Sequence, residues 1–163
     1  MRRFVPTMFV LATLAAPAAA QRLAPAATHP DFAGTWTLVP KKSEGAGLPA
    51  SMTLKVTKDS KLMTINRVGM TNMGEQRSTL IVNLDGSSTK NTVTTRGASV
   101  DLNLTQSWDG PVMVITTKAT IGGQPLDQTD RWTLDSDGKV LRVATVLSGG
   151  GQTKTQTLAF EKR

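Results

Sequence analysis

The sequence predicts an all-β protein: an antiparallel up-and-down β-barrel of about ten strands. Three observations lead to this fold class. Apolar and polar residues alternate with a period of two, as in Val100, Leu102 and Leu104, and this period is typical of half-buried strands. Turn residues such as Asp-Gly recur at regular short intervals, which favours a meander of neighbouring strands. From Asp31 onward no stretch of useful length has a helical pattern.

The first thirty residues have a different character. Arg2 and Arg3 precede an apolar run over 4–16 and a small-residue segment that ends at Ala20, the arrangement of a secretory signal peptide. The run is too short for a transmembrane helix, which needs about 20 apolar residues. We therefore expect a signal peptide over 1–20, an Ala/Pro-rich linker over 21–30 and one barrel domain over 31–163. Cleavage near Ala20 would place the mature chain in the periplasm or outside the cell, without a transmembrane segment.

Ten strands are expected in the barrel domain, with short connections between them. Their approximate ranges are 33–39, 51–58, 61–67, 76–84, 88–95, 98–108, 112–119, 128–134, 139–147 and 152–161. The connections alternate between tight aspartate turns at 59–60, 85–86, 109–110 and 135–138 and looser links at 40–50, 68–75, 96–97, 121–127 and 148–151. In an up-and-down meander, successive turns fall at opposite ends. The looser links should therefore surround one end of the barrel, where binding loops are often found.

The hairpin turns assign side chains to faces. Counting back from Asp109-Gly110 places Leu104 opposite Ile115, and counting from the turn at 135–138 places Trp132 opposite Leu141. Cross-strand neighbours share a face, so these residues should point inward. The strand 88–95 offers Thr89, Asn91 and Val93 to the same side. A polar stretch of this kind is compatible with a ligand contact and with an ordinary solvated strand.

A resemblance to a known family rests on the start of the domain and on two later motifs. Asp31-Phe32-Ala33-Gly34-Thr35-Trp36 contains the Gly-x-Trp signature of the calycin group, which includes lipocalins and fatty-acid-binding proteins. Together with Trp108-Asp109-Gly110 and Asp130-Arg131-Trp132, it resembles the small exported lipocalin-like proteins of bacteria. The resemblance implies a lipocalin- or fatty-acid-binding-protein-like barrel over nearly all of the mature chain.

The resemblance also implies structural roles for five residues. Gly34 would let the chain turn closely into the first strand, and Trp36 would plug the closed end of the barrel. In lipocalins an arginine from late in the chain packs on that tryptophan, and the candidates here are Arg131 and Arg163. Trp108 and Trp132 would complete the structural set. The chain lacks the cysteines and tyrosine of true lipocalins.

Several kinds of chemistry lack the residues they need. The sequence has no cysteine and a single histidine, His29, in the linker. This excludes a serine–histidine site and disfavours zinc or internal haem coordination. Basic residues give a net charge of +7 but form no run, and the aromatics are few, which disfavours nucleic-acid binding. We expect no enzyme activity, no cofactor and no metal.

Two functions stay open at this point. The first is non-enzymatic binding of a small hydrophobic or anionic amphipathic molecule. A basic, flexible mouth would serve it, and the expected ligand-binding residues are Arg67, Met70, Met73, Arg77 and Arg96. The second is a side-chain-filled barrel that acts through its surface as a protein-interaction or inhibitor module, for example on an envelope protein. Small, polar lumen residues would favour the first function, and interdigitated Leu, Met and Trp the second.

Overall fold

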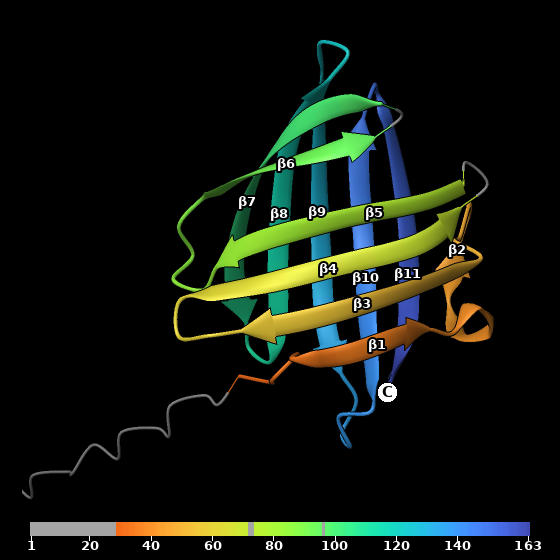
Figure 1. Cartoon of the computed structure of the whole chain (residues 1–163), viewed down its shortest axis with the longest axis vertical. Coiled ribbons are helices and arrows are strands. Elements are labelled where there is room, and N and C mark those ends of the chain that lie inside the picture. Colours follow the sequence, from red (N-terminus) through yellow and green to blue (C-terminus); the bar gives the residue numbers. More distant parts are fainter. Residues whose placement is uncertain (1–28, 72–73, 96) are drawn as a thin grey trace, which may run out of the picture.

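A computed structural model describes residues 29–71, 74–95 and 97–163, and the fold is the predicted antiparallel barrel. The predicted signal peptide, most of the predicted linker, Met73 and Arg96 lie outside these residues. Neighbouring strands pair in the order β5-β4-β3-β1-β11-β10-β9-β8-β7-β6. Figure 1 shows β1, β3, β4 and β5 crossing in front of β8 to β11. The strands are β1 (Gly34–Leu38), β2 (Glu44–Gly45), β3 (Ser51–Lys58), β4 (Leu62–Thr71), β5 (Gly74–Asn83), β6 (Thr89–Thr95), β7 (Ala98–Asp109), β8 (Val112–Ile121), β9 (Gln124–Leu134), β10 (Val140–Gly149) and β11 (Gln152–Lys162).

All ten predicted strands are present, which confirms the fold class. A short extra strand, β2, follows a 3₁₀ turn, η1 (Pro40–Lys42), and pairs with Gln156 and Thr157 in the middle of β11. The period-two pattern identified the strands because one face of each is buried while the other meets solvent. In β8, for example, Met113, Ile115 and Thr117 are buried and alternate with less buried residues.

The predicted contrast between tight and loose connections is wrong. We call the end with the connections 59–61, 84–88, 110–111 and 135–139 the aspartate end, and the other the glycine end. At the glycine end only 39–50 is long, because four connections there have two residues: 72–73, 96–97, 122–123 and 150–151. Gly122-Gly123 and Gly150-Gly151 all have positive φ, which suits two-residue hairpin turns. The strands at the glycine end extend farther than predicted. Their ends pair through backbone hydrogen bonds, which do not depend on apolar side chains.

Two predicted cross-strand partners are also wrong, each by two residues. Leu104 lies opposite Thr117 rather than Ile115, because the turn is centred on Gly110-Pro111. Trp132 lies opposite Val143 rather than Leu141, because the turn is centred on Asp137-Gly138, one residue later than predicted. A shift of two keeps each side chain on its face, so the inward orientation of all these residues was predicted correctly.

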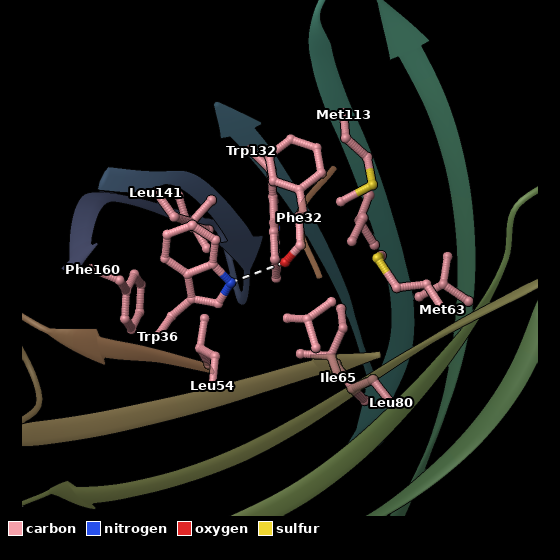
Figure 2. Packing of buried hydrophobic residues seen from close by; sticks show 14 of the residues in the cluster. Phe32, Trp36, Leu54, Met63, Ile65, Leu80, Met113, Trp132, Leu141 and Phe160 are labelled. Atoms are coloured by element: carbon pink, nitrogen blue, oxygen red, sulfur yellow. Dashed lines mark hydrogen bonds between the residues drawn. The ribbon is translucent and has the colours of Figure 1, made fainter. Parts of the chain in front are cut away.

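Large side chains fill the half of the lumen at the aspartate end. Trp36, Trp132, Phe160 and Met113 are all almost fully buried there, and Figure 2 shows them in one packed cluster with Phe32. The Trp36 indole donates a hydrogen bond to the carbonyl oxygen of Phe32 at 2.9 Å (Figure 2). This bond fixes the segment before β1 across the end of the barrel, so this half of the lumen is a packed core.

The barrel has one seam, between β5 and β6, which are the two edges of the sheet. Side chains bridge part of it. The Asn91 amide accepts from the Ile81 N–H at 2.7 Å and donates to the Ile81 carbonyl oxygen at 2.9 Å. Nearby, the Asn83 N–H donates to Thr89 Oγ1 at 3.0 Å. Asn91 therefore takes the place of a backbone partner at the end of the seam nearest the packed core.

Candidate functional site

Polar side chains line the other half of the lumen, toward the glycine end. Side chains along a strand point alternately inward and outward. Every second residue counted from a core tryptophan or leucine therefore also points into the lumen. In β9, Gln128 and Asp130 precede Trp132 on the inward face, and in β10, Thr145 follows Val143. This phase brings polar groups from separate strands together inside the barrel.

A cavity of about 160 Å³ lies among these side chains. It begins at Trp132 and Phe160, where the packed core ends. Strands β3, β4, β9, β10 and β11 supply its walls. The lining residues are Met52, Leu54, Arg67, Gln128, Asp130, Trp132, Val143, Thr145, Gln156, Leu158 and Phe160. The walls are thus apolar on several sides, with one group of polar side chains among them.

Asp130 is the centre of that polar group and is only 2% exposed. Its Oδ1 accepts hydrogen bonds from Thr145 Oγ1 at 2.6 Å and from Gln128 Nε2 at 3.0 Å. Its Oδ2 accepts from the same Gln128 nitrogen at 2.8 Å. A buried carboxylate needs such partners, and these contacts hold the Asp130 side chain in one orientation.

Arg67 brings the opposite charge to the cavity. Its Nη2 lies 3.8 Å from Asp130 Oδ2, a distance that allows electrostatic attraction but exceeds a hydrogen bond. The side chain is 25% exposed, so the cavity is not sealed around it. Arg67 Nε is nevertheless buried and has no hydrogen-bond acceptor among the described residues.

Trp132 carries a second unsatisfied donor. Its indole Nε1 is buried and likewise has no acceptor in the part of the chain that the structure describes. Buried polar groups are nearly always hydrogen-bonded in folded proteins. Both residues line the cavity, so its wall contains two N–H groups that lack acceptors among the described residues.

Among the expected ligand-binding residues that the structure describes, one lines this cavity. Arg67 does so, whereas Arg77 points outward from β5 and pairs with Glu75 at 2.7 Å. Met70 is also on the outer face and 44% exposed. Met73 and Arg96 lie outside the described residues. The described members of the set therefore do not gather around this cavity.

Arg67 and Arg77 both line a second space, a groove of about 480 Å³ along the open part of the seam. Its other lining residues are Asn66, Val68, Ser78, Thr79, Thr92, Val93 and Thr94. Because Arg67 lines both spaces, its side chain lies between the interior cavity and the seam.

The residues expected to be structural surround the packed core. Gly34 has φ +141°, and a Cβ there would lie 2.9 Å from Lys162 Cε. The cation above Trp36 is Lys162, with Nζ 5.2 Å from the ring centroid. Neither arginine candidate occupies that place: Arg131 points outward and pairs with Asp109, and the Arg163 N–H donates to the Thr35 carbonyl oxygen at 2.9 Å.

The other two tryptophans lie at the same end of the barrel. Trp108 stacks on His29 with ring centroids 3.9 Å apart. Trp132 and Phe32 pack in a T-shaped arrangement with ring centroids 5.8 Å apart. His29 is therefore in an aromatic contact at the aspartate end.

No group of three metal-ligating side chains occurs within 29–71, 74–95 and 97–163. None of the helices in these ranges is long and apolar enough to cross a membrane.

Sequence reasoning missed Asp130, Gln128 and Thr145 as site residues. The signal was present in the alternation itself, since Gln128 and Asp130 are in phase with Trp132, an expected interior residue. An acidic residue on the buried face of a strand is uncommon, and that departure from the apolar pattern marks the site.

Comparisons with known proteins bear on the fold. The wild-type fluorescent protein UnaG has 16% sequence identity and a TM-score of 0.55, over 81% of this chain and 97% of its own. A secretory abundant heat soluble protein from Ramazzottius varieornatus has 11% identity and a TM-score of 0.53, over 84% and 98%. The zebrafish ileal bile-acid-binding protein, solved with cholic acid, has 15% identity and a TM-score of 0.50, over 81% and 98%.

Comparisons of the sequence give no match of this kind. No protein-family model matches this chain, and no curated protein matches it at a significant level. At identities of this size, structural likeness carries the fold alone. The chain therefore has the calycin-type fold, an almost closed antiparallel barrel like that of the bile-acid-binding protein and UnaG.

Proposed function

We propose that this protein binds a small amphipathic molecule, without catalysis, in the polar half of its lumen. The observation that carries the proposal is the cavity beside Asp130, where the buried donors of Arg67 and Trp132 lack acceptors among the described residues. A bound ligand would satisfy them. The bile-acid-binding protein, solved with cholic acid, is a case of the same fold holding an amphipathic ligand.

The size of the cavity limits the ligand. At about 160 Å³, it is comparable to an engineered cavity of roughly 150 Å³ that takes up benzene. A single ring or an alkyl chain fits such a space, with its polar head group at Arg67, where the cavity is not sealed. The apolar part would contact Leu54, Val143 and Leu158, and the polar group would face Arg67.

Filling the cavity tests this function. Titration with 1-octanol, followed by ligand-observed NMR, should show saturable binding to the wild-type protein. Val143→Phe places a ring in the cavity and should abolish binding. Val146→Phe is the matched control, because Val146 is on the same strand with its side chain exposed outward, and binding should persist. Equal binding by both variants would place the ligand elsewhere and refute the proposal.

A second candidate function is a side-chain-filled barrel that acts through its surface, as a protein-interaction or inhibitor module. The packing of Trp36, Trp132, Phe160 and Met113 in the other half of the lumen favours it. So does the cavity volume, which is below the roughly 300 Å³ at which ligand pockets usually begin. Absence of binding by every small probe, in a correctly folded protein, would make this the leading function.

The proposed site of action is outside the cytoplasm, in the periplasm or the medium. The support is the pattern of Arg2, Arg3, the apolar run over 4–16 and Ala20. N-terminal sequencing of protein recovered from its own host should begin at Gln21. A first residue upstream of the apolar run would contradict export by cleavage.

A further inference from the structure

The charge of an acceptable head group is limited by the two charged side chains at the cavity. Arg67 alone would attract an anion. Asp130, however, places a carboxylate within 3.8 Å of its guanidinium, so the two opposite charges largely cancel. A ligand carboxylate would lose its hydration and meet the buried Asp130, and an ammonium group would meet Arg67.

The hydrogen-bonding capacity of the cavity points to the same kind of ligand. Both carboxylate oxygens of Asp130 are occupied by contacts from Thr145 and Gln128. Arg67 Nε and Trp132 Nε1, in contrast, have no acceptors among the described residues. The buried atoms without partners on residues that line the cavity are thus both donors, and an acceptor on the ligand would match them.

We propose that the cavity selects an uncharged amphiphile whose head group accepts hydrogen bonds, such as an amide, ketone or ester. This inference rests on the proposed function and specifies its ligand class. It replaces the sequence-based expectation of an anionic amphiphile, which assumed a group of unpaired arginines. Arg67 is compensated by Asp130 and Arg77 by Glu75, so neither is available as a free cation.

Three probes with the same octyl-length chain test the selection: octanamide, octanoate and octylammonium at neutral pH. Octanamide and octanoate have nearly the same shape and differ in charge. Isothermal titration of the full mature chain should show octanamide binding about tenfold more tightly than either ion, the effect expected when a buried polar group is poorly matched. The order of the three affinities for the wild-type protein decides the proposal, so the test holds even if a variant fails to fold.

A substitution at Asp130 tests the cause. Asp130→Asn keeps the size of the side chain but leaves the Arg67 charge uncompensated, so octanoate should gain about tenfold and bind about as tightly as octanamide. Asp127→Asn is the matched control, since Asp127 is an exposed residue on the same strand. It makes the same change in net charge and should leave the order of the probes unaltered.

The outcomes separate this inference from the proposed function. Tighter binding of octanoate than of octanamide to the wild-type protein would overturn the inference while leaving lumen binding intact. An equal response of the Asp130→Asn and Asp127→Asn variants would also overturn it, because the selectivity would then come from net charge. Failure of all three probes to bind would overturn both the inference and the proposed function.

Discussion

The side-chain amide of Asn91 forms a pair of hydrogen bonds with the backbone of Ile81, accepting at 2.7 Å and donating at 2.9 Å. These two residues lie on the two edge strands of the sheet, so the contact joins edges that have no ladder between them. One buried asparagine therefore closes the part of the seam next to the core. Farther along, the groove beside Arg67 remains.

Replacement of Asn91 should loosen the seam. Asn91→Leu removes both hydrogen bonds and leaves the Ile81 backbone groups without partners, which should lower the free energy of unfolding by about 1–3 kcal/mol. Urea unfolding measures this loss, and the Ile81 amide should exchange its hydrogen faster. Thr94→Leu, at an exposed position of the same strand, should change neither quantity. Unchanged protection of the Ile81 amide in Asn91→Leu would contradict the role given to Asn91.

Trp36 should make the largest single contribution among the core side chains. It has no exposed surface, and its indole holds Phe32 across the end of the barrel. Trp36→Ala should lower the free energy of unfolding by about 3–5 kcal/mol, the range for truncation of a buried aromatic. Trp36→Phe keeps much of the packing and should cost less. A melting temperature unaffected by Trp36→Ala would mean that the packed core does not stabilise the barrel.

The turn between β9 and β10 should make stability depend on pH. Hydrogen bonds to the Asp135 carboxylate, first from the Val140 backbone N–H, lower the pKa of this group below its ordinary value of 3.8. A lowered folded-state pKa contributes stability that is present above the ordinary value and is lost as pH falls through the folded-state value. Acid should therefore weaken the fold through Asp135.

Urea unfolding of the wild-type protein and Asp135→Asn across this range checks the effect. The variant should be less stable near neutral pH, and the difference should narrow as pH falls below 3.8, where the wild-type carboxylate also becomes protonated. A difference of constant size from neutral to strongly acidic pH would show that the charge of Asp135 is not its cause.

The fold could be predicted from the sequence because its main signal is local. Period-two alternation and aspartate turns mark ten strands, and a meander follows from their short connections. Loop lengths at the glycine end could not be predicted in the same way, because strand ends such as 68–71, which contains Gly69 and has no clear alternation, look like loops. The Lys162–Trp36 contact joins distant parts of the chain and has no local signal.

The candidate site was only partly accessible to sequence reasoning. Strand phase was enough to exclude Arg77, which is out of phase with the inward Leu80 and Val82. The same phase could have identified Asp130. That Arg67 faces Asp130 could not be predicted, because β4 and β9 are not neighbours in the sheet and approach each other only through the closed lumen.

The indole N–H signals of the three tryptophans test the central claim most directly. In a ¹⁵N-labelled protein titrated with octanamide, the Trp132 signal should move downfield as its unsatisfied Nε1–H gains an acceptor. The Trp36 signal should move little, since that N–H already donates to Phe32. Saturation of the Trp132 shift would place the ligand in the polar half of the lumen. Saturable binding that leaves the Trp132 signal unmoved would contradict this account.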